Sequence, residues 1–222
     1  MTVPTYTALV ERHAAPLLDE SGAALYSGAR TLRESALYVL GFNPGGSEGP
    51  TVRDSLDRLT SDPDRNEYGV AWGRDDEPGG HPLQRRLAWL LERLGYDVAD
   101  VCASNLIFAR TRDAVRAPYP EAADLCWPVH EAVLRDIRPH TLLVFGNGEP
   151  RSTHAYVRRA LTLVHDEVVH ESGHGNWRCK SFRSRLDDRD LLVVGLPHLS
   201  RYDVVGKDTV VDWIRERMGL RG

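Results

Sequence analysis

Four short apolar runs, each ending at a turn-forming residue, constrain most strongly what this chain can fold into. They occupy residues 36–40, 98–108, 141–145 and 191–196. Continuously apolar runs are typical of strands that are buried on both faces of a parallel sheet. Amphipathic segments with helical spacing lie between or after them, at residues 83–91, 120–137 and 208–218. Strands that alternate with helices predict an α/β fold: a three-layer α/β/α sandwich with a mainly parallel central sheet of about four strands.

The length favours one domain. The 222 residues are 41% hydrophobic and 27% charged, which is enough apolar material for one α/β core, and we predict a single domain over residues 1–222. Residues 47–80 are different, because they hold three prolines and a cluster of acids. We expect an insertion there, helical in part around residues 52–59. Long excursions at the carboxyl end of a strand are often functional.

Composition and cysteine usage exclude several classes of protein. No apolar run approaches the length of a membrane span, and the first residues lack a cationic start followed by an apolar stretch, so we expect no membrane contact and no secretory signal. The three cysteines are widely spaced, which predicts reduced thiols and a cytoplasmic protein. They are too few to ligate an iron–sulfur cluster, and we expect no cofactor. No obligate protein partner is evident.

The formal charge of -4 does not by itself favour a nucleic-acid-binding protein, but its distribution does at one place. Residues 172–186 carry four bases and no acid, namely Arg178, Lys180, Arg183 and Arg185. A positive edge on an acidic body is compatible with phosphate binding. With Trp177 and Phe182, these bases predict a loop over residues 173–185 that lies on a DNA backbone. A solvated hairpin is an equal alternative.

Polar residues follow the predicted strands. In parallel sheets the working residues gather beyond the carboxyl ends of the strands, and here those ends carry Asn43, Asn105, Asn147 and His198. The first strand is followed by Gly-Phe-Asn-Pro-Gly-Gly at residues 41–46. The glycines allow a ligand to approach the backbone closely, and the proline fixes Asn43. A nucleotide-binding interpretation is weak, because neither glycine-rich phosphate-binding motif is present.

The turn at residues 41–46 and the Pro-His-Leu-Ser turn at residues 197–200 together resemble the uracil-DNA glycosylase superfamily. The Gly-x-Asn-Pro-Gly form of the first turn is similar to that of the mismatch-specific and single-strand-selective branch. Ser104-Asn105-Leu106 and the run at residues 143–146 fall in the expected order, so the resemblance extends over roughly residues 35–218. The last turn departs from the usual His-Pro-Ser, since Leu199 stands at the proline position.

The resemblance implies a monofunctional, metal-independent DNA glycosylase that flips a pyrimidine out of DNA and hydrolyses its N-glycosidic bond. This reaction creates an oxocarbenium-like sugar and an anionic leaving base, so it needs a positioned water and a donor to the base. Asn43 would position the water, His198 would donate to the base oxygen, and Asn105 would read the base edge. Neither of the two turns, at residues 41–46 and 197–200, contains a lysine that could form a Schiff base, so no lyase activity is expected.

The contacts to DNA follow from the same resemblance. Ser200 would hold a phosphate, and either Arg201 or Tyr202 would fill the gap left by the flipped nucleotide. A solvent-exposed role for both stays open. Arg178, Lys180 and Arg183 are the expected contacts of the basic loop. Three arginines that follow Asn105 in the sequence extend the same basic surface, namely Arg110, Arg112 and Arg116.

Pocket size is the most specific expectation. Some uracil-specific members have a tyrosine, shortly after the first-motif proline, that blocks 5-substituted pyrimidines, whereas this chain has Gly45 and Gly46. We therefore expect a base pocket, lined also by Phe42, that tolerates bulky 5-substituents such as those of hydroxymethylated or glucosylated cytosine in phage DNA. Some relatives act in phage defence. Tyr68 and Trp72 of the insertion are candidate stacking surfaces, with a core position as the alternative.

Other functions stay open. Within enzymes, the chain could excise plain uracil in DNA repair. It could instead be a module that recognises a modified base or single strand without cutting, or a hydrolase of free nucleotides that needs no basic loop. The spacing of His165, His170, His174 and Cys179 could hold zinc. The adjoining arginine and lysine would repel a cation, so we expect no metal site.

Overall fold

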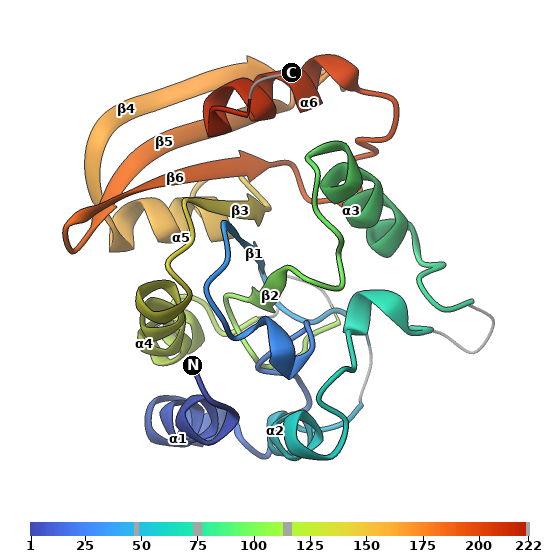
Figure 1. Cartoon of the computed structure of the whole chain (residues 1–222), viewed down its shortest axis with the longest axis vertical. Coiled ribbons are helices and arrows are strands. Elements are labelled where there is room, and N and C mark those ends of the chain that lie inside the picture. The colour runs from blue at the N-terminus through green and yellow to red at the C-terminus, as the bar shows by residue number, and fades with distance from the viewer. Residues whose placement is uncertain (47–48, 73–76, 113–116, 221–222) are drawn as a thin grey trace.

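The computed structural model describes residues 1–46, 49–72, 77–112 and 117–220. Within these ranges the chain folds around one mixed sheet of six strands, in the order β2-β1-β3-β6-β5-β4 (Figure 1). Four neighbouring strands are parallel: β1 (Leu37–Gly41), β2 (Cys102–Asn105), β3 (Thr141–Phe145) and β6 (Arg189–Leu196). Each lies in or overlaps one of the four apolar runs, and the predicted α/β class is confirmed.

The other two strands form an antiparallel hairpin, so the sheet is larger than predicted. β4 (Thr162–Glu171) lies at the edge, and β5 (Arg178–Leu186) pairs with both β4 and β6. The loop predicted over residues 173–185 is therefore wrong for most of that range, and the equal alternative, a hairpin, is what the structure shows. Phe182, expected on that loop, is fully buried, and its ring packs against His154 of α5 (Thr153–Ala160).

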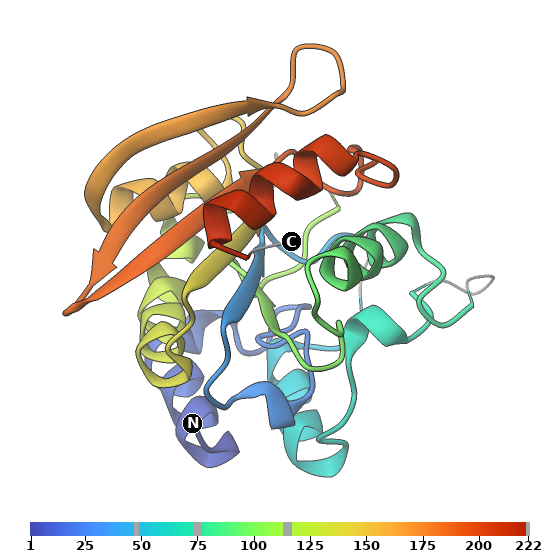
Figure 2. The same cartoon turned by 45° about the horizontal axis from the view of Figure 1, so that its top comes forward.

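Helices lie on both faces of the sheet (Figures 1 and 2). On one face are α1 (Val3–His13), α2 (Val52–Ser61), α4 (Glu121–Ile137) and α5, and on the other are α3 (Pro82–Arg93) and α6 (Asp208–Met218). The three predicted helices correspond to α3, α4 and α6. Short 3-10 helices are η1 (Ala15–Leu17), η2 (Ala29–Thr31) and η3 (Glu67–Gly69).

Successive residues of β1 belong to two different cores, which is the consequence of burying both faces of a strand. Tyr38 and Leu40 pack with α1 and α4, whereas Leu37 and Val39 pack with α3. All five residues of β1 are buried. The strand that leads into the turn at residues 41–46 is therefore packed on both sides.

The predicted insertion after β1 contains α2 and η3 in its described part. Thr51 and Asp54 form a reciprocal capping box at the start of α2, which explains why a helix begins there. Buried residues of this helix, including Leu56, join the core beside α1. In the described ranges, no helix is both long and apolar enough to cross a membrane.

Candidate functional site

A large pocket opens at the carboxyl ends of the parallel strands, and its volume is about 1110 Å³. Its wall includes all four polar residues predicted from the strand ends, namely Asn43, Asn105, Asn147 and His198. Parallel strands end at one edge of a sheet, so the topology brings these residues together. Pockets for small ligands usually measure roughly 300–1,000 Å³, so this one has room for more than a bare pyrimidine ring.

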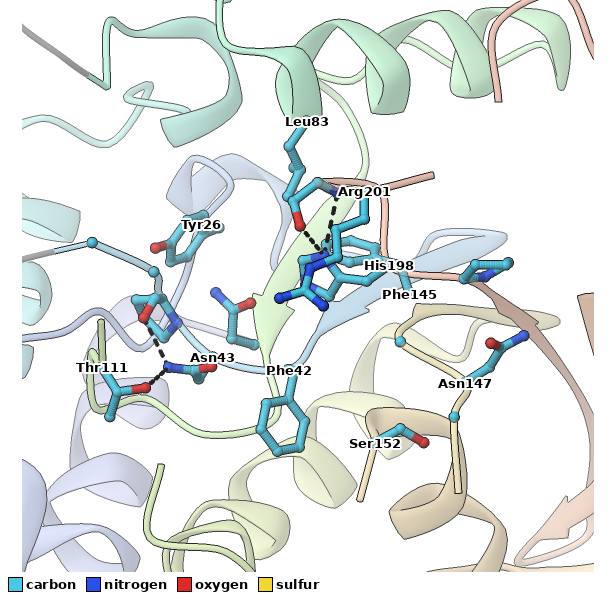
Figure 3. A pocket seen from close by; sticks show the side chains of 18 of the residues that line it. Tyr26, Phe42, Asn43, Leu83, Thr111, Phe145, Asn147, Ser152, His198 and Arg201 are labelled. Atoms are coloured by element: carbon cyan, nitrogen blue, oxygen red, sulfur yellow. Dashed lines mark hydrogen bonds between the residues drawn. The ribbon is translucent and has the colours of Figure 1, made fainter. Parts of the chain in front are cut away.

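Asn43 is fixed by both hydrogens of its side-chain amide. Its Nδ2 donates to the carbonyl of Pro44 at 2.8 Å and to Oγ1 of Thr111 at 2.7 Å (Figure 3). In the described part of the chain, no group donates to its Oδ1. Because both donors are used by the protein, the amide orientation is set, and the oxygen is the atom left to accept a hydrogen bond from a ligand or water.

Asn105 lies at the end of β2, directly opposite Gly41 in the strand register. Its side chain occupies the space above Gly41, where an added Cβ would overlap the Asn105 Oδ1 and crowd the ring of Phe145. Its side-chain amide interacts with the Tyr26 hydroxyl and, among the described residues, makes no hydrogen bond to the backbone. Asn105 is only 4% exposed, so this buried amide lies against the pocket with hydrogen-bonding capacity to offer a ligand.

Asn147 has a structural position instead. Its Nδ2 donates to the carbonyls of Arg178 and Gly195, at 2.7 and 3.0 Å. The amide therefore ties the end of β3 to β5 and β6. This explains the asparagine at a strand end without any role in binding.

His198 follows β6, and its protonation state can be deduced from its contacts. The backbone N–H of Ser200 donates to Nδ1 at 3.2 Å, and the Ser200 hydroxyl lies 2.8 Å from the same nitrogen. An N–H cannot accept, so Nδ1 carries the lone pair and the neutral ring bears its hydrogen on Nε2. Burial, reinforced by the charge of Arg201, lowers the pKa of His198 to about 4. The ring packs edge-on against Phe145, with centroids 5.4 Å apart.

These contacts make the site a set of neutral, pre-oriented hydrogen-bonding groups. Asn43 presents an acceptor, His198 presents a donor, and Asn105 presents both. Such a site suits a reaction in which negative charge develops on a bound group, because the donor needs no reorientation as the charge appears.

The insertion forms another part of the pocket wall. Tyr68 and Trp72 both line it, and both also pack into the core beside α3. The core position is therefore confirmed for Tyr68, and Trp72 packs against that core, while their stacking on a base stays a prediction. Phe42, Gly45 and Gly46 line the pocket as well, and a Cβ on Gly45 would meet no atom within 4 Å. The space beside the first-motif turn is open, as expected.

The predicted DNA contacts divide into two groups. Ser200 and Arg201 are exposed at the pocket, and Arg178 and Lys180 also line it. Tyr202 does not fit the prediction: it is fully buried, and its hydroxyl donates to the carbonyl of Ser172 at 2.6 Å. It therefore cannot enter a DNA duplex.

Arg183 is a second correction. Side chains along a strand alternate between faces, so Arg183 points to the face opposite that of Lys180. It lies on the α6 side, where its guanidinium donates to the carbonyl of Arg217 at 3.4 Å. It does not line the pocket and is not placed to contact a ligand there.

Two residues at the site, Thr111 and Tyr26, have no clear signal in the sequence, and a third, Arg110, has a contact that differs from the expected one. Thr111 orients Asn43, and the Tyr26 hydroxyl interacts with both Asn105 and Arg110. Arg110 donates to the Gly45 carbonyl at 2.5 Å, so it supports the first-motif turn. It had been expected only to extend a basic surface. Arg116, expected on the same surface, lies outside the described residues.

The histidines considered for zinc serve other contacts. His170 stacks on Trp213 at an interplanar angle of 7°, and Cys179 is fully buried. Over the described ranges, no three His, Cys, Asp or Glu residues are grouped so that they could hold a metal ion.

We predict that stability falls as the pH is lowered from about 6.5 to about 4. Burial lowers the pKa of His130, His154 and His198 to about 4, against about 6.5 in an unfolded chain. Between these values the unfolded chain binds more protons, so protonation favours unfolding. The melting temperature of a His130→Gln variant should therefore fall less steeply with pH than that of the wild type. His165→Gln changes an exposed histidine and is the control. If the melting temperature of His130→Gln falls with pH as steeply as that of the wild type and of this control, the prediction is wrong.

No family model matches the sequence, and a search of curated proteins gave no match.

Proposed function

We propose that this chain is a monofunctional, metal-independent DNA glycosylase with the three-layer architecture of the uracil-DNA glycosylase superfamily. It would act in the cytoplasm, flip a modified pyrimidine out of DNA and leave an abasic site. The observation that carries the proposal is the pairing, in one pocket, of a fixed acceptor on Asn43 with a neutral donor on His198. These are the two groups that hydrolysis of an N-glycosidic bond requires.

Each residue has a definite part in the proposed reaction. The Asn43 Oδ1 accepts a hydrogen bond from water and directs its lone pair toward the sugar C1′. As the C1′–N1 bond breaks, its electron pair moves into the base, and the His198 Nε2–H donates to the base oxygen that becomes negative. The water oxygen forms the new bond to C1′, and its proton is released to solvent. Asn105 pairs with the edge of the flipped base.

The size of the pocket supports a substrate with a large 5-substituent. Gly45 and Gly46 leave the space beside the first-motif turn open, and Tyr26, Tyr68 and Trp72 form a cluster of aromatic rings across the pocket wall. Aromatic faces pack well against sugar rings and flat groups. Hydroxymethylcytosine and its glucosylated form are the substrates that we favour, with antiviral defence as the purpose and uracil repair as the alternative.

An abasic-site assay tests the proposal. Matched single- and double-stranded DNAs would contain cytosine, uracil, hydroxymethylcytosine or glucosylated hydroxymethylcytosine, with alkali cleavage as the readout. Cleavage of the bulky bases that disappears in Asn43→Ala is the expected result. Cleavage of uracil alone would indicate a repair enzyme and remove the pocket proposal. Binding without any cleavage would point to a recognition module.

A tyrosine at position 45 should narrow the substrate range. An added Cβ on Gly45 meets no atom within 4 Å, so a side chain can start there without a clash, and we expect the ring of Gly45→Tyr to reach into the pocket that Gly45 lines. Gly46 is a poorer choice, because its φ of 101° disfavours any side chain. We expect Gly45→Tyr to lose cleavage of bulky bases by about tenfold or more while keeping cleavage of the smallest accepted base. Gly45→Ala is the matched control, and equal loss on all bases would refute the open-pocket model.

A further inference from the structure

Trp177 is a large aromatic side chain that the proposed chemistry does not use. It is 39% exposed, whereas Trp127 and Trp213 are 9% and 8% exposed. It stands at the tip of the β4–β5 hairpin, and Figure 2 shows the turn joining these strands projecting from the sheet. It also lines the same pocket as His198. Tryptophan is enriched at interfaces, where its large apolar ring contacts the ligand and its N–H stays hydrated, so an indole at the rim of a pocket is a candidate binding residue.

The hairpin tip holds this indole in place. The Trp177 carbonyl accepts hydrogen bonds from the Ser172 hydroxyl at 2.8 Å and from the Arg178 guanidinium at 3.0 Å, and the Trp177 N–H donates to the His174 carbonyl at 3.1 Å. The His174 ring lies 4.7 Å from the Trp177 ring at an interplanar angle of 49°. Because this contact is tilted rather than stacked, it supports the indole without covering it.

A second set of contacts ties the tip to the segment after His198. The Tyr202 hydroxyl donates to the Ser172 carbonyl, and Lys207 donates to the Gly173 carbonyl at 2.7 Å. The Tyr202 ring lies 6.4 Å from the Trp177 ring. Tyr202 therefore positions the indole relative to His198. The sequence had suggested a different role for Tyr202, namely filling the gap left by the flipped nucleotide.

The charges near the indole suit a nucleic acid. Arg178 and Lys180 line the pocket from β5, and Arg201 lines it from the other side of His198. Two of these cations are paired with acids: Glu171 lies 3.3 Å from Arg178, and Glu149 and Glu167 lie 3.7 and 3.6 Å from Lys180. Cations beside an exposed aromatic ring form the usual arrangement for stacking a base while holding its backbone.

We propose that Trp177 is a stacking platform for a base of the DNA strand that lies next to the flipped nucleotide. The inference rests on the proposed function only in that the ligand is DNA. It assigns to the hairpin tip the base contact that Tyr202, being buried, cannot make. Trp177 is thus a positioning residue: it sets where the strand lies, and Asn43 and His198 carry the chemistry.

Binding to DNA that contains no scissile base tests the platform directly. The probes are labelled single strands and duplexes with a tetrahydrofuran abasic analogue, and the readout is fluorescence anisotropy. Trp177→Ala should bind the single strand roughly 5- to 150-fold more weakly, the range expected for one base–aromatic stack. Trp177→Phe should restore most of the affinity. Val169→Ala, an exposed change on β4 away from the pocket, should bind as the wild type does.

Tryptophan fluorescence separates stacking from a structural role. DNA should quench part of the emission of the wild type, and the quench should be lost in Trp177→Phe even though that variant binds. Wild-type affinity in Trp177→Ala, or a full quench in Trp177→Phe, would overturn the platform. If the wild type binds the probes but cleaves no base, the glycosylase proposal fails and the same binding data still decide the platform. If the wild type binds no DNA, both fail.

Discussion

Replacement of Asn43 by alanine is expected to slow base release by about a hundred- to a thousand-fold while leaving the affinity for DNA nearly unchanged. The side chain has one open acceptor, because both of its donors are bound to Pro44 and Thr111. Its removal leaves the water without a fixed direction of attack. Single-turnover cleavage of a saturating substrate is the measurement, since it reports the chemical step alone.

Thr111→Val provides the matched control for orientation. It removes the oxygen that accepts from Asn43 and keeps the acceptor amide itself, so a smaller loss is expected than for Asn43→Ala. Equal binding and equal cleavage rates in the wild type and Asn43→Ala would exclude Asn43 from the reaction. Asn43 is only partly buried, so neither variant should fail to fold.

His198→Ala should slow the reaction by a similar factor of about a hundred to a thousand, the usual cost of removing one pre-oriented donor. Because the pKa of His198 lies at about 4, the ring is neutral across the physiological range. The cleavage rate should therefore show no titration of His198 near pH 6.5. Protonation of His198 should change the cleavage rate only as the pH falls toward about 4, where the imidazole becomes charged.

His198→Gln is the informative companion, because its amide can still donate. It should recover part of the rate lost in His198→Ala. A rate that titrates near pH 6.5 in the wild type and loses this dependence in His198→Gln would contradict the neutral donor. Ser200→Ala tests the tautomer, because it removes one of the two groups held against Nδ1.

The central strands could be predicted because β1, β3 and the last six residues of β6 are buried and almost entirely apolar; β2 is buried too, although it ends in Ser104 and Asn105. For residues 173–185 the sequence left a basic loop and a hairpin as equal alternatives. Along β5, Arg178 and Lys180 alternate with buried Cys179 and Ser181, and Arg183 follows buried Phe182, a pattern that also fits a basic loop. Along β4 nearly every residue is exposed, and its four apolar residues come in two separate pairs rather than in one run, namely Leu163, Val164, Val168 and Val169. β5 pairs with β6 on one side and with β4 on the other, and β4 pairs with β5 alone, so strand pairing decides the structure of both.

The site shows the same division. Asn43, Asn105 and His198 could be placed in one pocket because all three follow parallel strands. Thr111 could not be assigned to Asn43, since their contact joins residues 68 positions apart. The prediction that Tyr202 contacts DNA is wrong because closeness to His198 in the sequence does not determine the direction of a side chain. The chain bends after His198 so that this ring faces the core.

The two sides of the pocket differ in how freely their residues can change. Asn105 and Phe145 belong to strands and contact Gly41, so an altered side chain there disturbs the sheet that supports it. Gly45 and Trp72 lie in the first-motif turn and the insertion, away from the strand pairing. Mutations on that side can therefore alter which base is accepted while the bond-breaking groups stay fixed. Under the proposed role in antiviral defence, single substitutions in this turn or in the insertion would let the protein accept a new DNA modification of the phage.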